Sequence, residues 1–264
     1  MTYQHIRVEK LEGVCTVTFD RPDKLNALTY DSYGEFEDFT RGVSSDPDVH
    51  VVVLRGAGKA FCAGGDVHSI IGDMLPQDMR AHLEFTRMTG AVVENLRNLN
   101  QPVIAAVHGI CVGAGSVIAL ASDLRICARS ARFGFLFTKV GLTGADMGAA
   151  YLLPRIVGAG RASELLLFGD MVNADEAYRI GLANRVVDDA ELGTVVAELA
   201  ERLAQGPVLA QNLTKRMIQR ELDMDLASAI ESEAQAQALL MMGGDHAEFY
   251  ASWKEKRKPI WKGR

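Results

Sequence analysis

The sequence of 264 residues lacks the features that mark several whole classes of protein. Its four cysteines follow neither a metal-binding spacing nor the framework of a disulfide-rich secreted domain. No apolar run approaches the roughly 20 residues needed to span a bilayer. The first residues show no basic segment followed by an apolar one. The sequence therefore predicts a cytoplasmic protein with reduced thiols, without a membrane span and without a metal site.

Positive charge is also scarce. Against 34 acidic residues stand 28 lysines and arginines, which gives a formal net charge of −6. Such a chain has no overall attraction to nucleic acid or to acidic membranes, so neither is expected as a partner. The exception is the basic run at residues 254–258, which is either a solvated tail or a contact for a polyanionic ligand.

Three familiar catalytic motifs are missing as well. Ser116 lies between Gly115 and Val117 and lacks the second glycine of a nucleophile elbow. The six histidines include no pair at metal-ligand spacing. The segment 113–115 begins like a dinucleotide-binding motif, but Ile118 stands where the third glycine belongs. These absences argue against a nucleophile-elbow hydrolase, a histidine metal site and a nicotinamide-dependent oxidoreductase.

Strand and helix patterns alternate along the first three quarters of the chain. Alternation around residues 12–13 predicts a hairpin, and Thr29 is suited to cap the helix that follows it. The expected strands cover residues 5–10, 14–19, 49–54, 103–107 and 124–127, and the expected helices cover 30–43, 76–99 and a segment from about 116. Strands that alternate with helices indicate an α/β fold with helices packed on a sheet.

The strand signal disappears near residue 190. Residues 190–204, 207–222 and 226–242 carry helix-forming, amphipathic sequence instead. The chain is therefore predicted to divide into an α/β core, residues 1–195, and a helical C-terminal region, residues 196–264. The length suffices to bury the core of one large domain with such an appendage.

Two glycine-rich turns, each placed directly after an apolar run, are the most informative feature. The first covers residues 61–66 and the second residues 109–116. Small residues let a ligand approach the main chain and leave backbone N–H groups free to bind it. Two such turns brought together form the geometry that an oxyanion needs. Each turn alone is also a tight strand-to-helix connection, with Asp66 as a helix cap.

These turns belong to a longer series of motifs, and with them the chain resembles the crotonase, or enoyl-CoA hydratase/isomerase, superfamily. The resemblance extends over essentially the full length, and the motifs are specific as an ordered set. They cover residues 20–28, 59–67, 106–115, 122–128, 153–158, 169–177 and 181–187. The resemblance implies a spiral core of repeated ββα units and a C-terminal trimerisation region. It also implies a homotrimer, often paired into a hexamer.

The resemblance further implies a coenzyme A thioester substrate and no prosthetic group. The thioester carbonyl would lie between the backbone N–H groups of Ala63 and Ala114. Two such donors stabilise the negative charge that develops on this oxygen when a thioester enolate forms. The residues implied in binding the coenzyme A portion are Lys24, Leu25, Ala27, Gly64, Asp66, Val67 and Phe249, together with a lysine of the run 254–258.

The sequence departs from the family pattern at both glutamates that a hydratase of this family uses as general base and general acid. Val117 occupies the first position and Phe137 the second. Neither side chain can transfer a proton. Ordinary hydration by two glutamates is therefore not expected.

One carboxylate remains close by, at Asp146. It matches the aspartate that some enoyl-CoA and dienoyl-CoA isomerases and an aryl-CoA dehalogenase use. Apolar neighbours such as Phe135, Phe137 and Val117 would raise its pKa toward neutrality. Two roles stay open for Asp146: the catalytic base, or the N-cap of a helix over residues 147–157.

Isomerisation of an enoyl-CoA double bond needs one such base and is the reaction that these side chains favour. Three alternatives use the same platform: hydrolysis, carbon–carbon cleavage and dehalogenation of an acyl-CoA. A fourth is a protein that binds coenzyme A thioesters without catalysis, which the missing glutamates also allow. The sequence does not specify the acyl group.

Overall fold

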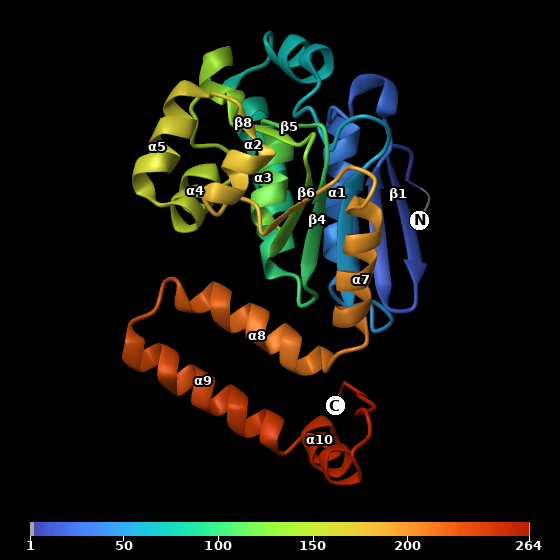
Figure 1. Ribbon diagram of the computed structural model, residues 1–264. Coiled ribbons are helices and arrows are strands. Elements are labelled where there is room, and N and C mark those ends of the chain that lie inside the picture. The colour runs from blue at the N-terminus through green and yellow to red at the C-terminus, as the bar shows by residue number, and fades with distance from the viewer. Residues whose placement is uncertain (1–2, 264) are drawn as a thin grey trace.

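A computed structural model describes residues 3–263 and shows a mixed α/β core with a helical arm at one end (Figure 1). The core holds a six-stranded sheet in which only the first two strands pair antiparallel. In spatial order its strands are β1 (Ile6–Leu11), β2 (Val14–Phe19), β3 (Val51–Gly56), β4 (Val103–Val107), β6 (Leu124–Ala128) and β9 (Arg185–Val187). A smaller sheet contains β5 (Ile110–Val112), β7 (Arg132–Gly134) and β8 (Val172–Asn173).

Helices cover both faces of the large sheet (Figure 1). The core helices are α1 (Tyr30–Val43), α2 (Met79–Asn98), α3 (Ala114–Ala121), α4 (Ala149–Val157), α5 (Ala159–Phe168), α6 (Ala174–Arg179) and α7 (Leu192–Ala204). Three short helical segments connect them, namely η1 (Pro22–Lys24), η2 (Val67–Gly72) and η3 (Leu136–Val140). The arm consists of α8 (Val208–Glu221), α9 (Leu226–Met241) and α10 (Gly244–Glu255). Within residues 3–263, no helix combines the length and the apolar character needed to cross a membrane.

The apolar central strands explain this layering. Successive side chains of a strand point to opposite faces, so a strand covered on both sides is apolar throughout. In β3, Val52 and Leu54 join the core cluster that contains α1, α2 and α3, whereas Val51 and Val53 join the cluster beneath α7. The strands therefore form the middle layer of the core.

Local signals identified many elements correctly. The hairpin of β1 and β2 is confirmed, and so is α1 with Thr29 as its N-cap. Thr29 and Ser32 cap each other's backbone N–H groups in a capping box. One expectation needs correction. The boundary expected at residue 195 falls inside α7, which packs on the sheet, so the arm begins at α8. Residues 244–255, which lie in the region predicted to be helical, form α10.

One buried lysine fastens the arm to the core. Lys215 of α8 is only 6% exposed, and its ammonium lies 2.8 Å from Asp123 Oδ2. It also donates hydrogen bonds to the carbonyls of Gln101 (2.8 Å) and Leu96 (3.3 Å). Burial lowers the pKa of Lys215, although Asp123 opposes this effect. The ion pair and the two carbonyls satisfy all three donors of the ammonium group.

We expect Lys215→Met to lower the free energy of unfolding by about 3 kcal/mol, because it leaves the Asp123 carboxylate without its cation. Urea unfolding followed by circular dichroism measures this change. Lys139→Met is the matched control, since Lys139 pairs with Asp170 at the surface and is expected to cost less than about 1 kcal/mol. Equal losses in the two variants would contradict the anchoring role.

Candidate active site

The two glycine-rich turns lie against each other in the structure. Cys62 and Cys111 are partners in an isolated parallel bridge, so the turns begin side by side. A Cβ atom built on Gly64, whose φ is +84°, would lie 3.0 Å from the carbonyl oxygen of Val112 and 3.6 Å from the amide nitrogen of Ala114. Glycine is therefore needed here by both backbone conformation and close approach. The contact places the main chain at Gly64 next to the start of α3.

The hydrogen bonds of these turns decide which N–H groups are free. Ala63 N–H donates to the carbonyl of Leu25 at 3.0 Å, so it is already used within the fold. This contradicts the expectation that Ala63 supplies an unoccupied oxyanion donor. Within residues 3–263, the N–H groups of Gly65 and Ala114 have no protein acceptor. Ala114 is the first residue of α3, where N–H groups lack an intrahelical partner and the helix dipole favours negative charge.

The loop and the turn expected to bind coenzyme A are in direct contact. Leu28 N–H donates to the carbonyl of Gly64 at 2.7 Å, and Asp66 N–H donates to the carbonyl of Leu28 at 2.8 Å. Lys24 and Val67 are exposed beside this contact, and Ala27 is half-buried. The structure thus brings together the six core residues expected to contact coenzyme A.

A buried asparagine that is not among the predicted site residues holds this loop in place. Asn26 is 1% exposed, and its amide donates to the carbonyls of Ala60 (2.7 Å) and Ala57 (2.9 Å). Its side-chain oxygen accepts a hydrogen bond from the N–H of Arg21 at 3.0 Å. The sequence signal that points to this role is the asparagine inside the motif at residues 20–28. Asparagine tolerates the left-handed backbone that this position adopts (φ +57°).

Asp66 caps the helical segment η2, as the sequence predicted. Its carboxylate accepts hydrogen bonds from the N–H groups of His68 (3.1 Å) and Ser69 (3.3 Å). It also pairs with the guanidinium of Arg21 at 3.2 Å. Burial alone would raise the pKa of Asp66, but these donors outweigh it and hold the pKa below the usual range. Asp66 is therefore an ionised structural group beside the turn, and not a proton donor.

Phe249 lies far from the other residues expected to contact coenzyme A. It belongs to α10 at the end of the arm, and the arm extends away from the core at the end opposite η2 (Figure 1). Its side chain is 52% exposed. A single chain therefore does not bring Phe249 to the loop at residues 24–27.

Asp146 does not cap α4. The N-cap is Gly148, and no side chain bonds to the first turn of this helix. Met147 (φ +50°) and Gly148 (φ +87°) both adopt left-handed backbone, which separates Asp146 from the helix start. Asp146 contacts the start of α4 only through its backbone carbonyl, which accepts a hydrogen bond from the Ala149 N–H at 2.8 Å. The capping hypothesis is therefore wrong, and the carboxylate is left for another role.

The surroundings of Asp146 suit a base. Burial raises the pKa of its carboxyl group, and the N–H of Met147 only partly offsets this. Tyr33 is 3% exposed, and its pKa is raised by burial and, to a smaller extent, by the charges of Cys62 and Asp146. Tyr33 thus lies within electrostatic reach of both Asp146 and Cys62, and Cys62 belongs to the first turn. Val117 and Phe137, at the glutamate positions, are buried in the same core.

Comparison with known proteins assigns this architecture. The profile of the enoyl-CoA hydratase/isomerase family matches residues 9–264. The chain belongs to the enoyl-CoA hydratase/isomerase family. It is an enzyme of this family, whose members process acyl-CoA thioesters, and the crotonase-like α/β fold expected from the sequence is confirmed.

Its relatives in the enoyl-CoA hydratase/isomerase family differ in the reaction that their names state. The chain is 36% identical to a crotonyl-CoA hydratase of Syntrophomonas wolfei subsp. wolfei, with 98% of each chain covered. It is 34% identical to a 1,2-epoxyphenylacetyl-CoA isomerase of Escherichia coli, with 97% of each covered. A solved structure from Streptomyces coelicolor A3(2) superposes with a TM-score of 0.98 at 52% identity, covering 100% of this chain and 96% of the other.

Proposed function

We propose that this enzyme moves the double bond of an enoyl-CoA, with Asp146 as its single acid–base group. The observation that carries the proposal is a pair of free backbone N–H groups, at Gly65 and Ala114, in a protein whose Val117 and Phe137 cannot transfer protons. Gly65 takes the place of Ala63 because the Ala63 N–H is bonded to Leu25. The two free donors hold the thioester oxygen, where negative charge develops.

The reaction requires one proton to leave one carbon and return to another. The Asp146 carboxylate removes a proton from C2 of a 3-enoyl-CoA, and the electron pair of the C–H bond moves toward the thioester oxygen to give a dienolate. The carboxylic acid then returns the proton to C4, which places the double bond between C2 and C3. The raised pKa of Asp146 suits both steps, because the group must accept and release a proton near neutral pH.

Assembly of several copies completes the coenzyme A site in this proposal. Phe249 and the basic run at residues 254–258 belong to the arm, away from the loop of the same chain. The arm also exposes large apolar side chains that a partner can cover, including Leu226, Met242 and Trp253. We therefore propose a homotrimer, alone or paired into a hexamer, in which the nucleotide is contacted by α10 of a neighbouring copy.

Incubation of the enzyme with trans-3-hexenoyl-CoA, followed by identification of the product, tests the proposed reaction. We expect conversion to trans-2-hexenoyl-CoA, followed by the ultraviolet absorbance of the conjugated thioester and by chromatography. Release of free thiol would identify a hydrolase, and binding without any product would identify a non-catalytic protein. Hydration is the second candidate, because a relative is named a crotonyl-CoA hydratase. A 3-hydroxyacyl-CoA formed from trans-2-hexenoyl-CoA would support it and contradict single-base isomerisation.

A further inference from the structure

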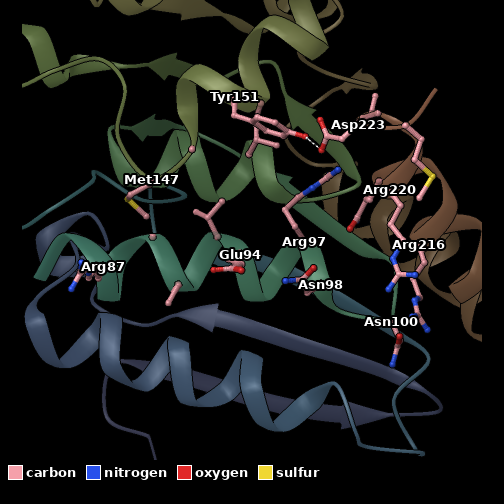
Figure 2. A pocket seen from close by; sticks show the side chains of 18 residues that line it. Arg87, Glu94, Arg97, Asn98, Asn100, Met147, Tyr151, Arg216, Arg220 and Asp223 are labelled. Carbon is pink, nitrogen blue, oxygen red and sulfur yellow. Dashed lines mark hydrogen bonds between the residues drawn. The ribbon is translucent and has the colours of Figure 1, made fainter. Parts of the chain in front are cut away.

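A cavity of about 1210 Å³ opens between the core helices α2 and α4 and the first helix of the arm, α8 (Figure 2). Four arginines line it. Arg97 of α2 lies toward one end with Arg216 and Arg220 of α8, and Arg87 lies at the other end (Figure 2). No residue of the two glycine-rich turns lines this cavity, so it is separate from the candidate thioester site.

The four arginines have no partner within the described chain, residues 3–263. None of them forms an ion pair with a carboxylate. None of their guanidinium groups donates a hydrogen bond to the protein, whereas that of Arg21 donates to the carboxylate of Asp66 at 3.2 Å. A guanidinium carries five N–H donors and keeps its positive charge in proteins. The cavity therefore presents charged donors that the described chain does not use.

The carboxylates of the cavity do not balance this charge. Glu94 and Asp223 line it, against the four arginines. Asp223 is already engaged, because it accepts a hydrogen bond from the hydroxyl of Tyr151 at 2.5 Å and pairs with Arg155 at 3.3 Å (Figure 2). The lining therefore carries an excess of positive charge.

A buried cation beside the cavity adds to this excess. Lys215 directly precedes Arg216 on α8, and its ammonium occupies the carboxylate of Asp123 at 2.8 Å. Burial lowers the pKa of Lys215, Asp123 opposes this effect, and the positive charge of Arg97 adds to the lowering. Arg97 and Arg216 are half-buried, so water screens their charges less than those of exposed arginines. An anion placed between α2 and α8 relieves the repulsion among these cations.

We propose that this cavity is a binding site for a phosphate-bearing anion, held by Arg97 of α2 and by Arg216 and Arg220 of α8. Arginine suits phosphate because its planar fork donates paired, charge-assisted hydrogen bonds to phosphate oxygens. Arg216 and Arg220 are four residues apart on one helix, so both can face the same ligand. The volume exceeds that of a single phosphate group, which leaves room for a diphosphate or a nucleotide.

A bound anion ties the arm to the core, because it contacts α2 and α8 at once. Lys215 already fastens α8 to the core through Asp123, and this link is permanent. The link through the anion exists only when the ligand is present. Binding therefore stabilises the folded enzyme in proportion to ligand concentration. The inference goes beyond the proposed reaction and does not depend on it.

Isothermal titration calorimetry with inorganic diphosphate, in a low-salt buffer free of phosphate, tests the inference. We expect the native enzyme to bind diphosphate and to melt at a higher temperature in its presence. In the double variant Arg97→Gln/Arg216→Gln we expect the affinity to fall about 100-fold, which is about tenfold for each charge-assisted hydrogen bond lost. The rise in melting temperature should disappear in this variant.

The source of the phosphate group is distinguished by titration with ADP. Tighter binding of ADP than of inorganic diphosphate identifies a nucleotide as the ligand class. Equal or weaker binding of ADP identifies the free inorganic anion. Either result supports the site, provided that the affinity falls in Arg97→Gln/Arg216→Gln.

Two control variants separate the cavity from other basic positions. Arg185→Gln/Arg202→Gln removes the same charge at exposed arginines of β9 and α7, outside the cavity, and should keep the affinity. Lys24→Gln removes a cation from the loop expected to contact coenzyme A, which itself contains a diphosphate, and should also keep the affinity. If Arg97→Gln/Arg216→Gln fails to fold, each single variant is expected to lose about tenfold.

Three outcomes overturn the inference. The first is that the native enzyme binds neither inorganic diphosphate nor ADP. The second is an affinity that survives in the cavity variant, or that falls equally in Arg185→Gln/Arg202→Gln, which marks a response to net charge alone. The third is a loss in Lys24→Gln with the cavity variant unaffected. This last result assigns the anion to the coenzyme A loop and leaves the proposed function standing.

Discussion

Asp146→Asn is expected to lower kcat by about 10²- to 10⁴-fold while KM changes little, because the variant keeps the shape of the site and loses the group that moves the proton. Steady-state kinetics with trans-3-hexenoyl-CoA measures both constants. Asp188→Asn is the matched control, since Asp188 forms an exposed ion pair with Arg129, and it should keep full activity. Undiminished kcat in Asp146→Asn would remove Asp146 from the mechanism.

The pH dependence of the native enzyme follows from the same group. A base acts in its ionised form, and burial raises the pKa of Asp146. We therefore expect kcat to rise with pH through an apparent pKa above that of an ordinary aspartate. A profile that stays flat down to about pH 4, the range of an unperturbed aspartate, would contradict the assignment.

The raised pKa of Asp146 also predicts that Asp146→Asn stabilises the fold at neutral pH. A folded-state pKa above the unfolded value gives a contribution to stability that is complete below the unfolded pKa and is lost as pH rises through the folded pKa. Asparagine carries no charge to desolvate, so the variant avoids this loss. The melting temperature should exceed that of the native enzyme at about pH 7, and the difference should vanish in acid.

Ala114→Pro is expected to lower kcat by about 10²- to 10³-fold, because it removes the N–H group proposed to hold the thioester oxygen. Proline is normally tolerated at the first position of a helix, where the N–H has no intrahelical partner, and Ala114 occupies this position in α3. Gly113 precedes it with a backbone conformation that only glycine adopts readily (φ +53°). The loss should therefore reflect the missing donor and not an unfolded α3.

The variant Ala114→Ser provides the control for this experiment. Serine keeps the backbone N–H at the same position and should retain most of the activity. Circular dichroism and the affinity for free coenzyme A should match the native enzyme in both variants. Full turnover by Ala114→Pro would show that the thioester oxygen binds elsewhere.

The sequence predicted those parts of the molecule that local rules determine. The hairpin, the cap at Thr29 and the cap at Asp66 each depend on a few neighbouring residues, and each is confirmed. The motif order identified the family, and the two glycine-rich turns do meet. Their contact was predictable because both turns follow apolar runs that suit neighbouring strands.

Other parts depend on contacts between distant segments. The hydrogen bond that occupies the Ala63 N–H was not predictable from the turn that contains Ala63, because the acceptor is the carbonyl of Leu25 in a separate loop. The left-handed backbone at Met147 moved the start of α4 and removed the capping role of Asp146. Arg97 and Arg216 line one cavity only because Lys215 fastens α8 beside α2. Periodicity within one segment contains no information on such pairings.

The choice of main-chain donors has a consequence for how this enzyme and its relatives diverge. If the thioester oxygen is held by peptide N–H groups at Gly65 and Ala114, no single substitution other than proline deletes the donor at either position. Mutations at Val117 or Phe137 then change the fate of the enolate while the groups that hold its oxygen stay in place. New reactions become accessible through single side-chain changes, because the activation of the thioester survives each of them.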